Sequence, residues 1–162
     1  MPAMRLRDKV ALVTGAGSGI GRATVKKFLT EGAHVVACDV NQSALDALSQ
    51  EGPGLIMVKG DVCDRADTEK VVQKAIDQFG QLDILVNSAG ISPRSLDADA
   101  DFEARWDAVI EVNVKGTMLM SHAAVDGMRK SGGGSIVNMG SIMSLVGYPT
   151  TLPFSDGFNP YP

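Results

Sequence analysis

The sequence predicts an α/β fold, in which a doubly wound parallel sheet carries helices on both faces and so forms three layers. Short apolar runs alternate along the chain with longer segments in which apolar residues recur at helical spacing. Short apolar strands that are separated by helices require a parallel sheet covered on both faces. Right-handed crossovers between these strands then give the doubly wound order.

The first half of the chain contains three predicted strands and two helices. Lys9–Val13 is largely apolar and is predicted to be the first strand. The helix Gly19–Glu31 follows, because Ile20 and Phe28 fall on one apolar stripe. Gly32, just beyond this helix, is a typical helix stop. The other elements of this half are a strand at His34–Asp39, a short helix at Gln42–Gln50 and a strand at Leu55–Lys59.

The second half continues the same alternation. Arg65–Phe79 is predicted to be a helix with Val72 and Ile76 on its apolar side, and Gly80 ends it. Gly147–Pro162 contains four prolines that rule out a regular helix, so it is predicted to be a loop. The elements between them are a strand at Asp83–Val86, a long helix at Phe102–Lys130 and a strand at Ser135–Met139.

Composition restricts the class of protein. The chain has 162 residues, 44% hydrophobic and 21% charged, which fits one globular domain with one core. A formal net charge of −4 argues against a nucleic-acid partner, and no apolar run is long enough for a membrane span. The first residues form no apolar signal segment, so we expect a cytoplasmic location. Cys38 and Cys63 are too few for a disulfide framework or a zinc site, and no metal is expected.

The stretch Thr14–Gly21 is the strongest indication of function. It reads Thr-Gly-Ala-Gly-Ser-Gly-Ile-Gly and lies between the first predicted strand and the first helix. Such a turn is a phosphate cradle, because it bends tightly and its backbone must approach the phosphates closely. The free N–H groups and positive dipole end of the helix also favour an anion. The residues expected to hold a dinucleotide here are Gly15, Ser18, Gly19, Ile20 and Gly21.

Four motifs give the chain a resemblance to a known family. The glycine spacing G-x-x-x-G-x-G is followed by Asn87–Gly90, by Asn113 within Val-Asn-Val, and by the strand Ser135–Ser141. In this order they resemble the classical short-chain dehydrogenase/reductase family, although the second residue of Asn-Ser-Ala-Gly is usually asparagine there. The resemblance covers about Leu6–Gly147. It implies a Rossmann-like fold, with five strands present of an expected seven.

Further positions are expected to select and hold the cofactor. Asp39 ends the second strand, where a carboxylate can accept hydrogen bonds from an adenosine ribose and would repel a 2′-phosphate. NAD is therefore favoured, and Arg22, which follows the glycines, leaves NADP as the less favoured cofactor. The resemblance implies adenine contacts from a pair of residues and further cofactor contacts at the end of the fourth strand. These residues are Asp61 and Val62, and then Asn87, Ala89 and Gly90.

The resemblance also implies the reaction chemistry. In the family a serine holds the substrate oxygen, a tyrosine supplies the proton, a lysine lowers the pKa of that tyrosine, and an asparagine holds a water in the proton relay. Ser141 matches the serine and Asn113 matches the asparagine. Asn113 also lies in the middle of a predicted helix, where asparagine has low propensity, and such a local conflict is typical of a functional position.

The tyrosine has two registers in this sequence. With the commonest family spacing, the tyrosine position is occupied by Phe154 and the lysine position by Phe158. The site would then have no proton donor and no positive charge to lower its pKa. If residues 149–160 carry a loop extension, Tyr161 takes the place instead, and we predict Tyr161 as the catalytic tyrosine. The matching lysine would then lie beyond Pro162.

The leading hypothesis is an NAD-dependent oxidoreductase that transfers a hydride between nicotinamide and a secondary alcohol or ketone. Residues 1–147 would form its dinucleotide-binding domain, and residues 148–162 an incomplete substrate-loop segment. We expect the sequence to be a truncated part of a longer enzyme, which would be a homotetramer or homodimer at full length. The alternative hypothesis is a non-catalytic dinucleotide-binding module or an inactive, truncated subunit of the same family.

Overall fold

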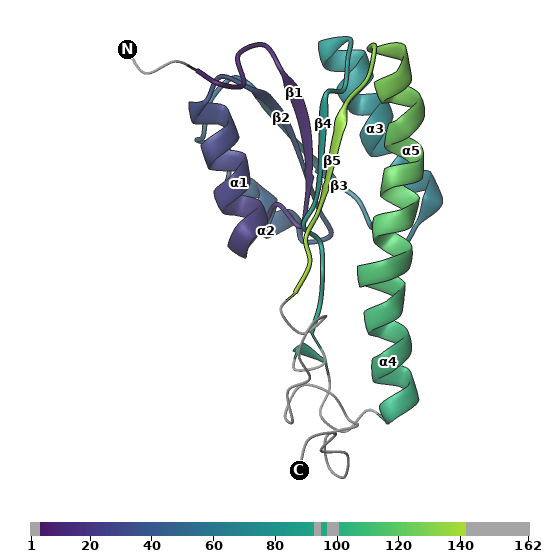
Figure 1. Cartoon of the computed structure of the whole chain (residues 1–162). Helices are drawn as coiled ribbons and strands as arrows, with labels where there is room; N and C mark the ends of the chain where they lie inside the picture. The colour runs from purple at the N-terminus through teal and green to yellow at the C-terminus, as the bar shows by residue number, and fades with distance from the viewer. Residues whose placement is uncertain (1–3, 93–94, 97–100, 142–162) are drawn as a thin grey trace, which may run out of the picture.

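A five-stranded parallel sheet forms the centre of the protein. The computed structural model describes residues 4–92, 95–96 and 101–141, so the predicted substrate-loop segment 148–162 lies outside the described residues. The strand order is β3-β2-β1-β4-β5, and all neighbouring strands are parallel, which confirms the predicted doubly wound fold (Figure 1). The strands are β1 (Val10–Thr14), β2 (His34–Asp39), β3 (Leu55–Lys59), β4 (Ile84–Asn87) and β5 (Ser135–Asn138).

Helices cover the two faces of this sheet. Helices α1 and α2 lie on one face, and α3 and α5 pack against each other on the opposite face (Figure 1). Helix α4 continues through the π-helical segment η2 into α5 as one long helical run. The helical elements are α1 (Gly19–Thr30), α2 (Gln42–Asp46), α3 (Arg65–Phe79), α4 (Phe102–Ile110), η2 (Glu111–Gly116) and α5 (Thr117–Lys130).

Each face of the sheet has its own apolar core. Side chains alternate along a strand, so neighbouring positions of β1 face different layers. Leu12 joins Val71 of α3 and Met120 of α5 in one core, whereas Val13 joins Val25 of α1 and belongs to the other. All five residues of β1 are buried, as is typical of a central strand in a parallel sheet that is covered on both faces.

Two predicted helices differ from those observed. The helix expected at Gln42–Gln50 ends at Asp46, because Leu48 and Ser49 donate to carbonyl groups only three residues back and form tighter turns. The long helix expected at Phe102–Lys130 is present, but six of its residues, Glu111–Gly116, form the wider π turn. The other predicted boundaries lie within one residue of those observed.

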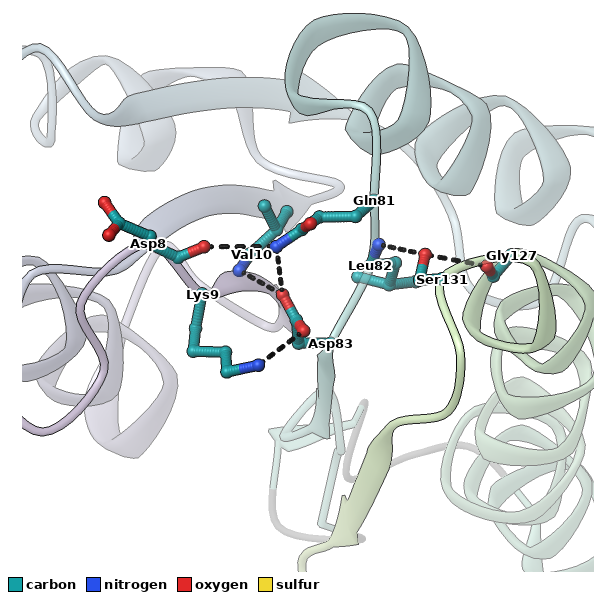
Figure 2. A network of polar contacts seen from close by, with 8 residues as sticks. All are labelled: Asp8, Lys9, Val10, Gln81, Leu82, Asp83, Gly127 and Ser131. Carbon is teal, nitrogen blue, oxygen red and sulfur yellow. Dashed lines mark hydrogen bonds and ion pairs between the residues drawn. The ribbon is translucent and has the colours of Figure 1, made fainter.

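A polar network ties β1 to β4 where both strands begin (Figure 2). The Asp83 carboxylate accepts hydrogen bonds from Val10 N at 2.8 Å, from Lys9 Nζ at 2.9 Å and from Gln81 Nε2 at 2.8 Å. Partial burial alone would raise the pKa of Asp83, but these donors outweigh it, and the pKa lies below its usual value. Gln81 Nε2 also donates to the Asp8 carbonyl at 3.1 Å.

The same edge is tied to α5. Leu82 N donates to Ser131 Oγ, and Ser131 Oγ donates to the Gly127 carbonyl, each at 3.1 Å (Figure 2). The amino edge of the sheet is therefore held together by groups of the protein itself.

The side of the sheet beyond β5 is uncovered in the described part of the chain. All four residues of β5 are exposed, and the outer side of the long helical run exposes further large apolar side chains. Among the described residues no helix combines the length and apolar character that a membrane span needs. The exposed apolar residues of the helical run are Trp106, Ile110, Val114 and Met118.

Candidate functional site

A cavity of about 510 Å³ lies at the carboxyl edge of the sheet, where ligands gather in doubly wound folds. It lies at the switch point of the topology, between the segments that follow β1 and β4. Ten of the eleven predicted cofactor residues line it. They are Gly15, Ser18, Gly19, Ile20, Gly21, Asp39, Asp61, Val62, Ala89 and Gly90.

Close backbone approaches explain the glycines of the turn. A Cβ on Gly21 would lie 2.1 Å from the Gly15 carbonyl oxygen, and a Cβ on Gly15 would lie 2.8 Å from Ala89 Cα. Gly15 also has a φ of +61°, which favours glycine. The start of α1 can therefore pack against Gly15, and Gly15 against the segment after β4, only with glycine at both positions.

The amino end of α1 is left open by the protein. Ser18 precedes this helix in an extended conformation, yet its side chain makes no capping hydrogen bond, and the first turn of α1 has no acidic residue. The starts of α2, α3 and α4 are each capped by a side chain, from Asn41, Asp64 and Asp101 respectively. Because Ser18 and the first residues of α1 line the cavity, the positive end of this helix faces it.

Asp39 connects β2 to the glycine-rich turn. Its Oδ2 accepts from Gly17 N and its Oδ1 accepts from Asn41 N, both at 2.9 Å. The cap of α2 is supplied by Asn41, whose side chain accepts from Ala44 N at 3.2 Å. The Asp39 carboxylate is thus held at the cavity wall beside the turn instead of capping a helix.

The segment after β3 forms another wall. Asp61 Oδ1 accepts from Cys63 N at 2.8 Å and shapes this turn, and Val62 is buried with 7% of its surface exposed. Cys63 Sγ lies 3.5 Å from the Glu111 carbonyl and donates to it. Burial, together with the negative charge of Asp61, raises the pKa of Cys63 to about 11, so this thiol stays protonated at neutral pH.

Thr14 is a site residue that sequence reasoning missed. Its side chain is buried at the end of β1, and Oγ1 accepts from Ser88 N at 3.1 Å and from Ala89 N at 3.0 Å. This hydroxyl fixes the segment after β4 against the glycine-rich turn. The position of a hydroxyl residue directly before Gly15 is the only sequence signal for it.

Asn87 lies behind the cavity and is not among its lining residues. Its buried side chain donates from Nδ2 to Ser121 Oγ and to Asn138 Oδ1, both at 2.9 Å. It thereby ties β4 to α5 and β5. A cofactor contact of Asn87 stays a prediction.

Asn113 lies in the π-helical segment and holds the loop that follows β4. Its Oδ1 accepts from Ile91 N at 2.8 Å, and its Nδ2 donates to the Ile91 carbonyl at 2.9 Å. The Asn113 carbonyl accepts from Thr117 Oγ1 at 2.9 Å. Single π turns frequently occur at functional sites, and this one combines with the low helix propensity of asparagine.

The predicted reaction residues are only partly described. Ser141 follows β5 and is exposed, and it lies outside the cavity lining. Tyr161 and Phe154, the two registers for the tyrosine, lie outside the described residues. Within the described part of the chain, no group of three or more histidine, cysteine or acidic side chains is placed to hold a metal ion.

The sheet order, the glycine-rich turn and the open helix end define a Rossmann-like nucleotide-binding domain. A family model described as short chain dehydrogenase matches residues 9–155. The chain belongs to this family, as its four motifs predicted.

Several known proteins are similar to this chain. The 3-oxoacyl-[acyl-carrier-protein] reductase FabG of Thermotoga maritima is 44% identical over 151 residues, which are 90% of this chain and 61% of the relative. The D-threitol dehydrogenase of Mycolicibacterium smegmatis is 44% identical over 147 residues, 88% of this chain and 56% of the relative. The chain therefore spans about three fifths of the length of these relatives.

A solved structure also matches. The 3-ketoacyl-(acyl-carrier-protein) reductase from Brucella melitensis, complexed with NADH, superposes with a TM-score of 0.72 at 35% sequence identity. The match covers 78% of this chain and 52% of the solved chain. This neighbour binds a nicotinamide dinucleotide in the same fold.

Proposed function

We propose that the protein is an NAD-dependent oxidoreductase that interconverts a secondary alcohol and a ketone. The open amino end of α1 at the cavity carries this proposal, because it offers free N–H groups and a positive dipole to a pyrophosphate. The cavity of about 510 Å³ lies in the usual range for ligand sites. The names of the relatives, an oxoacyl reductase and a polyol dehydrogenase, support the substrate class.

The residues at the cavity fit a dinucleotide. The glycine-rich turn with Gly15, Gly19 and Gly21 would hold the pyrophosphate, and the turn after β3 with Asp61 and Val62 would hold the adenine. Ser18, Ile20, Ala89 and Gly90 complete this wall, and Asn87 supports it from behind. When bound, the nicotinamide supplies the hydride chemistry, and the protein positions and polarises the reactants.

Asp39 supports NAD as the cofactor and NADP as the less favoured alternative. Its carboxylate lies at the cavity wall, fixed by Gly17 N and Asn41 N. A 2′-phosphate beside this charge would be repelled, whereas ribose hydroxyls can donate to it. The NADH in the solved neighbour is consistent with this choice.

Proton transfer is assigned to Ser141, Tyr161 and Asn113. Ser141 would hold the substrate oxygen, and Tyr161 would donate or accept its proton. Asn113 would act in the proton relay, and its side chain already fixes the backbone at Ile91, beside the cavity. A homotetramer or homodimer would cover the exposed apolar side chains of the α4–α5 run.

Cofactor binding and turnover together test this proposal. We expect NADH fluorescence to report binding that is tighter than NADPH binding, and a panel of ketones to include a substrate. The Asp39→Ala variant should reduce the difference between its affinity for NADH and its affinity for NADPH. Absence of NADH binding would contradict the proposal, and binding without turnover of any ketone would favour the non-catalytic dinucleotide-binding module.

A further inference from the structure

Gly116 is the last residue of the π-helical segment, and it lies against Val62 in the wall of the cavity. A Cβ on Gly116 would lie 2.6 Å from Val62 Cγ2, 3.2 Å from Val62 Cβ and 3.5 Å from the Val62 carbonyl carbon. Cβ atoms do not approach other atoms as closely as 2.6 Å, so one of the two residues would have to move. Gly116 is buried, and Val62 lines the cavity.

The conformation of Gly116 does not itself require glycine. Its φ of −58° and ψ of −45° are ordinary helical values, and glycine in a helix is destabilising relative to alanine. The close approach to Val62 is therefore the reason for a glycine here. The contact lets the helical run pack directly behind the turn after β3, where Cys63 Sγ also donates to the Glu111 carbonyl at the start of the π-helical segment.

We propose that Gly116 is a positioning residue, which sets the shape of the adenine part of the cavity by admitting the Val62 side chain. This inference rests on the proposed function, because it takes the turn after β3 as the adenine wall. A side chain at position 116 would press Val62 toward the cavity and narrow the space for the adenine ring. The cavity wall after β4 would keep its support, because Asn113 binds Ile91 through separate hydrogen bonds.

Two ligands distinguish an effect on the adenine part of the cavity from an effect on the rest of the site. NADH contains the adenine, whereas reduced nicotinamide mononucleotide lacks it, and the fluorescence of the reduced ring reports binding of both. We expect Gly116→Ala to weaken NADH binding by about tenfold and to leave binding of the mononucleotide unchanged. Equal weakening of both ligands, or no weakening of NADH, would overturn the inference.

Gly127→Ala is the matched control. Gly127 is buried on α5, but a Cβ there would lie 3.4 Å from Val72 Cγ1 and 3.5 Å from Ile76 Cδ1, at the ends of side chains that can adjust. This variant should bind both ligands as the unmodified protein does. An unmodified protein that does not bind NADH would overturn the proposed function and this inference together, whereas NADH binding that Gly116→Ala leaves intact overturns the inference alone.

The Val62→Ala background gives a second test, which also serves if the single glycine variant does not fold. Without the Val62 methyl groups, the substitution at Gly116 no longer has its closest contact. We therefore expect the ratio of NADH to mononucleotide affinity to be the same in Val62→Ala and in the double variant. A double variant that stays unfolded, or whose ratio falls as in the single variant, would contradict a role through Val62.

Discussion

Helices α1 and α3 both follow a strand of the sheet, but their amino ends are built differently. Helix α3 begins at the Asp64 cap, whose side chain accepts from Asp67 N at 3.0 Å, and Asp67 adds negative charge to the first turn. Helix α1 begins at Ser18 without a side-chain cap and without an acidic residue in its first turn. In α3, a side chain of the protein accepts a hydrogen bond from one of the free N–H groups at the helix start. In α1, no side chain does so, and the free N–H groups stay open to the cavity.

This difference carries a cost in stability. A good cap contributes about 1 kcal/mol to a helix, and α1 lacks this contribution in the unliganded protein. The same N–H groups become binding groups when an anion enters the cavity. Changes at the start of α1 are therefore expected to alter cofactor affinity, whether or not they also alter stability, whereas changes at the cap of α3 are expected to alter stability alone.

Gly21→Ala is expected to have the largest effect. The new methyl group would meet the Gly15 carbonyl oxygen at 2.1 Å, and because this is backbone, the start of α1 must move. We expect stability to fall by roughly 1–3 kcal/mol and NADH affinity to fall by about a hundredfold or more. Urea unfolding and NADH titration measure the two quantities. An affinity close to that of the unmodified protein would show that the turn does not hold the cofactor.

Asp64→Ala tests the other side of the comparison. Removing the cap of α3 should lower the free energy of unfolding by about 1 kcal/mol. NADH affinity should stay unchanged, since Asp64 is not a lining residue of the cavity. Asp64→Asn keeps a capping oxygen and is the control, with little loss of stability. A fall in NADH affinity in Asp64→Ala would show that the two helix ends are not independent.

Two carboxylates, Glu31 and Asp83, accept hydrogen bonds within the protein, and they should make a smaller contribution to stability that depends on pH. Hydrogen bonds from Arg5 and Lys27 lower the pKa of Glu31 to about 2, and the pKa of Asp83 is also lowered. The unfolded chain therefore binds protons more tightly at these two groups. Their contribution to stability is present above the usual carboxyl pKa of about 4 and is lost as the pH falls toward about 2.

Urea unfolding between about pH 5 and about pH 3 measures this loss. Asp83→Asn should be less stable at the higher pH and should lose less stability on acidification than the unmodified protein. The network around Asp83 lies where β1 and β4 begin, so this loss reports on the amino edge of the sheet (Figure 2). Identical pH profiles for the two proteins would contradict the role of this carboxylate.

The sequence predicted the fold and most of the cavity because both depend on local patterns. Apolar runs such as Val10–Val13 identify strands, and the glycines indicate the turn by their spacing alone. The π turn at Glu111–Gly116 gave no such signal, since six residues are too few to separate its period from that of an α-helix.

Long-range hydrogen bonds also escaped prediction. The Thr14 hydroxyl meets Ser88 N, which is 74 residues away, and the inward direction of Asn87 depends on Ser121 and Asn138. These partners come together only through the order of strands in the sheet. The contact of Gly116 with Val62 is of the same kind, because it joins a helix to the turn after a different strand.

The most direct measurement of the central claim is NADH affinity and thermal stability in Ser18→Asp. A carboxylate at this position can cap α1 and complement its dipole, so the unliganded protein should gain about 0.5–1 kcal/mol. The same charge would occupy the place of the pyrophosphate, and NADH affinity should fall by about tenfold or more. Ser18→Asn, which caps without charge, should lose less affinity. A Ser18→Asp protein that is stabilised but binds NADH as tightly as the unmodified protein would contradict a phosphate site at the amino end of α1.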